Sequence, residues 1–300
     1  MLTIRGPAPR LALIAGVVWA GAGSAQSWLP EAGETSYAVS YTDTFDTKHL
    51  TPTGQEVDAG HMRFYTYGFA AAYSPTDRIM LNATVPLIRS EYHGPDPHPT
   101  TADDGSYHST FTDLRVEAHY QLMLEPVALA PYIAYLFPTH TYETLGHAAP
   151  GRGLDETWLG VAAGKSLDAW IPRTYVQARF TYAVVEHVQG ISHDKENIEF
   201  DLGYYITPDV SVQGLVHWQK TLGGLVFYGP PQESDPLFPY HDQLAATGFT
   251  NAGVSGSWYY SDHSTLSLGY MEGVSGRNGH KLGRSFTIAY SYGFFGFRPR

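Results

Sequence analysis

The stretch TDLRVEAHYQL, Thr112 to Leu122, decides how the whole chain is interpreted. Its polar and apolar side chains occupy alternate positions, with Asp113, Arg115, Glu117, His119 and Gln121 on one face and Leu114, Val116, Ala118, Tyr120 and Leu122 on the other. Successive side chains of a strand point to opposite faces, so this alternation predicts a strand. The apolar face would cover the core of a soluble sheet or meet lipid in a membrane barrel, whose polar face lines the lumen. This stretch alone leaves both structures open.

The first 25 residues have the composition of a secretory signal peptide. Arg5 and Arg10 precede an unbroken apolar run from Leu11 to Ala22, and the small residues Gly23, Ser24 and Ala25 follow. A basic region, a short apolar region and a small-residue cleavage site are the three parts of such a peptide. The run is shorter than the ~20 apolar residues of a membrane-spanning helix. We therefore expect residues 1–25 to be removed, and residues 26–300 to form one exported domain.

Composition excludes several classes of protein. The formal net charge is −11, and an acidic chain is a poor ligand for nucleic acid because phosphate repels it. The chain contains no cysteine, which excludes disulfides, thiolate metal sites and cysteine nucleophiles. It contains 22 tyrosines, 14 phenylalanines and 6 tryptophans, which favours strands and suits a membrane–water interface.

The spacing of alternating segments indicates about twelve strands of roughly 10–14 residues. They are expected at 36–45, 61–73, 79–92, 110–124, 129–138, 154–167, 174–186, 196–206, 210–221, 247–261, 264–273 and 281–295. Long polar connections, the last at Val274–His280, alternate with turns of a few residues. Pro86 predicts a bulge, because proline cannot donate to a ladder. This rhythm predicts an all-β fold, a transmembrane antiparallel up-and-down β-barrel with short periplasmic turns and long external loops, rather than a secreted soluble β-protein.

Short motifs across most of the mature chain resemble a known family. They are Thr112–Arg115 followed by Tyr120–Leu122, Phe137–Thr139, Gly151–Gly153, Gly160, Gly164–Ser166, and the run Tyr73–Pro86 with its Thr76–Arg78 turn. These motifs resemble the outer-membrane transporters associated with the meta-pathway of phenol degradation. Thr112 and His140 depart from the pattern, which has glycine at both positions. The resemblance implies a channel or transporter for hydrophobic or aromatic compounds in the outer membrane of a Gram-negative cell.

The polar faces of the strands hold the candidate functional residues. We expect a channel for passive uptake of small solutes, including hydrophobic or aromatic ones, whose lumen is lined by Asp113, Arg115, Glu117, His119, Gln121, Arg179, Glu199, Asp201 and His217. Arg115 lies between two acidic residues on one face, which favours paired charges, because an isolated buried charge is costly. A structural barrel filled by an ion-pair network remains the alternative.

Other chemistry has weaker support in the sequence. His93, Asp96, His98 and His108 could together bind a metal, but their spacing matches no compact ligand motif, so we expect no metal and no other cofactor. An outer-membrane lipid-modifying enzyme is the remaining alternative. The chain lacks the His-x-Ser pair that the outer-membrane phospholipase carries on one strand, and we expect no enzyme. The expected partners are outer-membrane lipid and a small-molecule solute, with no nucleic acid. The sequence does not predict an oligomeric state.

Overall fold

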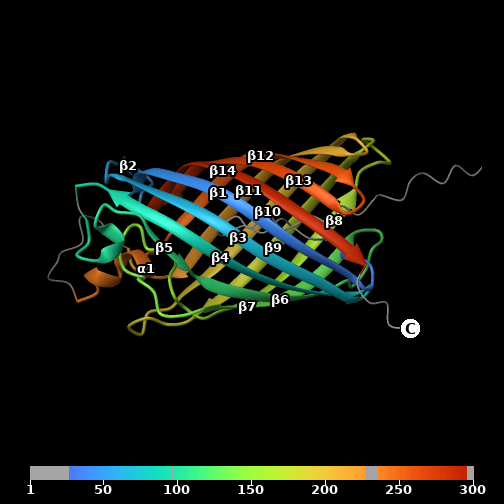
Figure 1. Ribbon diagram of the computed structural model, residues 1–300. Helices are drawn as coiled ribbons and strands as arrows, with labels where there is room; N and C mark the ends of the chain where they lie inside the picture. The colour runs from blue at the N-terminus through green and yellow to red at the C-terminus, as the bar shows by residue number, and fades with distance from the viewer. Residues whose placement is uncertain (1–26, 96, 227–235, 296–300) are drawn as a thin grey trace, which may run out of the picture.

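The computed structural model describes residues 27–95, 97–226 and 236–295, which form a closed antiparallel barrel (Figure 1). The expected signal peptide lies outside the described residues. The wall contains β1 (Glu34–Leu50), β3 (His61–Thr76), β4 (Ile79–His93), β6 (Asp113–Tyr120), β7 (Ala128–Pro138), β8 (Glu156–Ser166), β9 (Thr174–Val185), β10 (His193–Thr207), β11 (Val210–Gly223), β12 (Gly248–Ser261), β13 (Ser264–Arg277) and β14 (Gly279–Phe295). The loops add β2 (Glu56–Val57), β5 (His108–Phe111), the 3-10 turns η1 (Thr101–Asp103) and η2 (Phe238–Tyr240), and α1 (His241–Leu244). No helix among these residues is long and apolar enough to span a membrane.

The barrel closes between its first and last strands. Each wall strand pairs with the strands next to it in the chain, and β14 pairs with β1 from Glu34↔Phe295 to Leu50↔Gly279. Closure gives the backbone groups of the edge strands partners, which a lipid environment requires because no water is present to bind them. The predicted fold class, an all-β barrel of about twelve strands, is confirmed.

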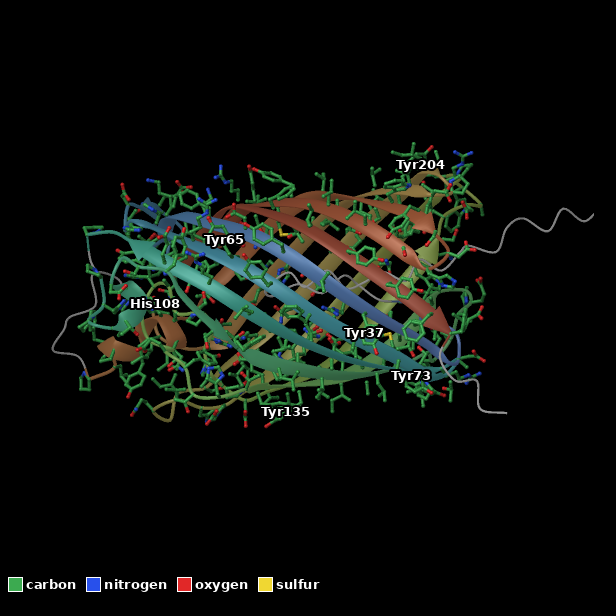
Figure 2. The ribbon with its side chains drawn as sticks, in the orientation of Figure 1. Tyr37, Tyr65, Tyr73, His108, Tyr135 and Tyr204 are labelled. Atoms are coloured by element: carbon green, nitrogen blue, oxygen red, sulfur yellow. The ribbon has the colours of Figure 1, made fainter. Side chains whose placement is uncertain are left out.

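Alternation along each strand separates an apolar outer surface from a polar interior. Phe180 and Leu202 are exposed on the outside, whereas their chain neighbours Arg179 and Asp201 are buried within the barrel. Ala118 lies on the outer face with Val116, as the sequence predicts. Figure 2 shows the exposed side chains of Tyr37, Tyr73 and Tyr204 near the end that carries the short turns. The strand positions next to these turns also hold exposed aromatic residues, namely Tyr120, Trp258, Tyr260 and Tyr292. Such a belt is typical of a membrane–water interface.

The strand predicted at 110–124 is wrong in its details. It divides at Thr112 into β5 and β6, both of which pair with β4. Between the pairs Thr84↔Arg115 and Leu87↔Phe111, residues 85–86 of β4 face residues 112–114 of the other strand. The extra residue is a bulge opposite Pro86, whose carbonyl accepts a bond from the Thr112 amide (3.0 Å). The bulge predicted from Pro86 is therefore confirmed.

The loop predicted at Val274–His280 is also wrong. β13 runs on to Arg277 and β14 begins at Gly279, with Asn278 between them at a φ of 51°. Asparagine tolerates this left-handed conformation better than most residues. Near Asn278 the two strands of this hairpin pair with their other neighbours instead of with each other. β13 pairs with β12 up to Gly248↔Arg277, and β14 pairs with β1. The strict alternation of long loops and short turns therefore fails at the last connection.

Candidate functional site: the barrel lumen

Charged side chains on one arc of the wall pair with one another inside the barrel. On β6, Arg115 Nε lies 2.8 Å from Glu117 Oε1, and Glu117 Oε2 lies 2.9 Å from His119 Nε2. Across β9 and β10, which pair at Arg179↔Glu199, Arg179 Nη2 lies 2.8 Å from Glu199 Oε1. The side chains of Arg179 and Glu199 are only 3% and 5% exposed. This arc carries charge that is neutralised within the wall.

Tyr132 on β7 supports this charged arc. Its ring stacks on the His119 ring with centroids 4.9 Å apart, and the Arg179 guanidinium lies 5.4 Å from its centroid. Its hydroxyl bonds the Thr181 hydroxyl. Tyr132 can lie along the wall only because Gly160 faces it on β8, where an added Cβ would come within 2.4 Å of the ring. Glycine at this position therefore sets the geometry of the network.

A second charged group lies on the same arc and centres on Glu156. Its carboxylate lies 2.8 Å from Lys195 Nζ and 2.5 Å from Arg152 Nη2, and it accepts a bond from Trp158 Nε1 (2.8 Å). Trp158 in turn lies beneath the Arg115 guanidinium, 4.4 Å from ring to cation. Sequence reasoning missed this group, because it considered only the inner faces of predicted strands. Arg152 lies in a loop, and the predicted strands left Lys195 in a loop as well.

The segment before β1 enters the barrel at its periplasmic end. The Ser27 amide donates to Gln177 Oε1 (3.1 Å), and the Leu29 amide donates to Gln121 Oε1 (2.9 Å). Gln121 Nε2 donates back to the Ser27 carbonyl (3.1 Å), and Trp28 meets Tyr175 edge-on. Gln177 lies on the inner face of β9, and Gln121 directly follows the last residue of β6. The sequence analysis assigned no role to this segment, because it carries no motif or periodicity that predicts an insertion into the barrel.

The opposite arc of the wall is uncharged over most of its surface and contains a cavity. The cavity has a volume of about 210 Å³ and lies between β1 and β11–β14. Hydroxyls bond across this wall, as between Thr42 and Thr287 (2.9 Å) and between Thr44 and Ser285 (3.2 Å). The lining consists of Thr42, Thr44, Asp46, Leu50, His217, Phe249, Asn251, Met271, Gly273, Ser275, His280, Lys281, Leu282 and Ser285.

The nine residues predicted to line the lumen have different roles in the structure. All lie on inner faces, and five of them are bound in ion pairs with one another: Arg115, Glu117, His119, Arg179 and Glu199. Of the other four, Asp113 accepts a bond from the Tyr142 hydroxyl, Gln121 binds the entering segment, Asp201 is buried, and His217 lines the cavity.

Several solved structures share this fold. An outer-membrane channel from Pseudomonas putida F1 aligns over 91% of this chain and 100% of that chain, with a TM-score of 0.71 and 16% sequence identity. This chain has the fold of an outer-membrane channel. The β domain of the Bordetella autotransporter Brka aligns over 87% of this chain and 100% of that chain, with a TM-score of 0.52 and 9% identity. No family model and no curated protein matches the sequence.

The residues considered as possible metal ligands in the sequence do not gather where the structure describes them. His93 lies 3.2 Å from Glu91, and His108 lies 2.9 Å from Asp104. Asp96 lies outside the described residues. Of the three that the structure describes, His98 alone turns into a buried cluster, formed with histidines of other loops.

Proposed function

We propose that this protein is an outer-membrane channel for passive entry of small solutes of about the size of a single aromatic ring. The observation that carries the proposal is the cavity between β1 and β11–β14, bounded by the inner wall of a channel fold. The paired charges of the opposite arc supply the rigid side of the lumen, because each ion there already has a partner.

The size and lining of the cavity support the proposed solute class. An apolar protein cavity of about 150 Å³ holds benzene, so a volume of about 210 Å³ admits one ring with small substituents. Phe249, Leu50 and Met271 offer apolar contacts, and Thr42 and Asn251 offer hydrogen-bonding groups. A pocket with apolar walls and a few polar groups orients ligands of mixed character, such as hydroxylated aromatic compounds.

The proposal includes removal of the signal peptide and location of the protein in the outer membrane. Removal of residues 1–25 would leave Gln26 at the start of the mature chain, next to the segment that binds Gln121 and Gln177 inside the barrel. We place the protein among the outer-membrane transporters of phenol degradation that its motifs resemble. N-terminal sequencing of the protein from outer-membrane fractions tests the cleavage and the location together.

A liposome-swelling assay tests the channel. Proteoliposomes containing the wild type should swell in 4-hydroxybenzoate and not in sucrose, which exceeds the cavity. Asn251→Trp should fill the cavity and abolish the swelling. Val254→Trp is the matched control, since Val254 lies three residues further along β12 and is exposed on the outer surface. This variant should swell as the wild type does.

The outcomes separate channel from structural barrel. If liposomes with the wild type admit neither solute, and the protein shows no conductance in planar bilayers, the lumen is filled. The protein is then a structural barrel, filled by the ion-pair network and by the segment before β1. If liposomes with Asn251→Trp and liposomes with Val254→Trp swell equally, solutes pass through a part of the lumen other than the cavity.

A further inference from the structure

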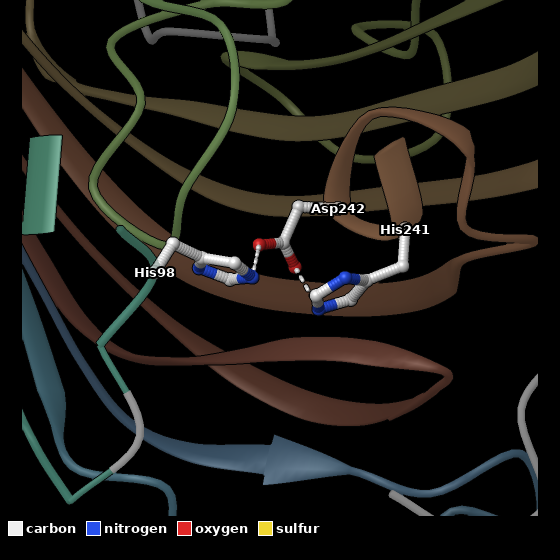
Figure 3. A group of neighbouring side chains, drawn as sticks. All are labelled: His98, His241 and Asp242. Atoms are coloured by element: carbon white, nitrogen blue, oxygen red, sulfur yellow. Dashed lines mark ion pairs between the residues drawn. The ribbon is translucent and has the colours of Figure 1, made fainter. Parts of the chain in front are cut away.

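Four histidines from separate parts of the chain surround Asp242 at the external end of the barrel. His98 comes from the loop after β4, His147 from the loop after β7, His241 from α1, and His280 from the start of β14. Their ring nitrogens lie 3.6–3.7 Å from the two Asp242 carboxylate oxygens. Figure 3 shows His98 and His241 pointing at this carboxylate from opposite sides.

These distances are too long for hydrogen bonds but suit ligands that share one ion. Four ligands at about 2.0–2.1 Å from a tetrahedral Zn²⁺ are about 3.3–3.4 Å apart. His98 and His147 approach Oδ2 of Asp242, and His241 and His280 approach Oδ1. Asp242 Oδ2 and His280 Nε2 are buried and have no hydrogen-bond partner within the described part of the chain.

Outer partners orient two of the imidazoles. His98 Nδ1 lies 2.8 Å from Asp103 Oδ2, and His241 Nδ1 lies 2.6 Å from the Phe238 carbonyl oxygen. If each Nδ1 donates its proton there, each Nε2 keeps a lone pair and faces Asp242. A carboxylate or carbonyl that accepts the outer N–H is the usual support of a metal-binding histidine.

The orienting carboxylate is itself fixed in place. Asp103 is buried and accepts bonds from the backbone amides of His98, His147 and Ala148, each 3.0 Å long. The same residue therefore joins the loops that carry His98 and His147.

The donor set favours a transition-metal ion at the centre of the cluster. The ligand atoms of His98, His241 and Asp242 all lie within 4.8 Å of one another. Imidazole is a preferred ligand of divalent Zn, Cu and Ni, and the carboxylate adds an oxygen ligand.

We propose that His98, His241 and Asp242 bind one divalent transition-metal ion such as Zn²⁺ at the external mouth of the barrel, with His147 and His280 beside its remaining position. Asp103 acts as a positioning residue through His98. Since His280 also lines the cavity, the ion would lie at the outer end of the space proposed for solutes. The site does not depend on whether the barrel conducts.

Metal binding is measured directly on the folded barrel in detergent. The protein is prepared without a polyhistidine tag, stripped with EDTA, and titrated calorimetrically with ZnCl₂. We expect one Zn²⁺ per chain and no binding of Mg²⁺, which prefers oxygen ligands. His241→Ala and Asp242→Asn should each abolish the titration. Asp103→Asn should weaken the affinity by about 10–100-fold, as loss of an outer partner does.

A matched control separates the cluster from surface histidines. His187→Ala removes an exposed histidine of another external loop and should leave the titration unchanged. Each variant must keep the heat-dependent gel mobility of a folded barrel. The proposal is overturned if the folded wild type binds no Zn²⁺, or if His241→Ala and Asp242→Asn bind it as the wild type does.

Discussion

Replacing Arg179 with methionine tests whether the charged arc stabilises the barrel. The change removes the cation 2.8 Å from Glu199 and the contact with the Tyr132 ring, and it leaves a carboxylate that is 5% exposed without its partner. Breaking a buried ion pair from one side costs about 3–5 kcal/mol, because the remaining charge stays desolvated. We expect Arg179→Met to lose about 3 kcal/mol or more of unfolding free energy, measured by urea titration in phospholipid vesicles with tryptophan fluorescence.

A double substitution distinguishes the stranded charge from lost packing. Arg179→Met with Glu199→Gln removes both charges, and we expect most of the lost free energy to return, because the unpaired ion causes most of the cost. Lys48→Met is the exposed control: Lys48 lies 4.0 Å from Asp58, both are well exposed, and such pairs contribute at most about 1 kcal/mol. The reasoning is refuted if Arg179→Met costs no more than Lys48→Met, or if the double variant is less stable than the single one.

Three further changes test the wall, its outer face and the predicted charges. Gly160→Ala should destabilise the barrel by about 1–3 kcal/mol in the same urea titration, since its Cβ would collide with Tyr132, and an unchanged midpoint would contradict this packing. Phe180→Arg should cost about 2–4 kcal/mol, as cations do near the middle of a lipid-facing surface, and no loss would invert the assigned faces. Glu117→Gln with Asp201→Asn should shift the reversal potential under a salt gradient toward anions if the predicted acidic face sets selectivity. An unchanged potential would locate the path at the cavity instead.

The sequence by itself determined the wall of this protein. Alternation along Thr112–Leu122 and its counterparts assigns each residue to lipid or lumen, because a strand fixes side-chain direction by position alone. Pro86 predicted its bulge for a similarly local reason, the missing amide proton. Where local signals conflict, the prediction failed: glycines and a polar run at Val274–His280 suggested a loop, but pairing with β12 and β1 on either side holds those residues as strand.

Only the tertiary structure decided what the inner side chains and the loops do. Arg179 meets Glu199 because the register of β9 against β10 places them opposite each other, and no single strand carries that register. His98 lies far in the sequence from His241 and Asp242, and they meet because two long loops turn over the same end of the barrel. Strand periodicity is a local property that the sequence shows directly, whereas these contacts depend on how strands pair and on where loops from distant parts of the chain meet.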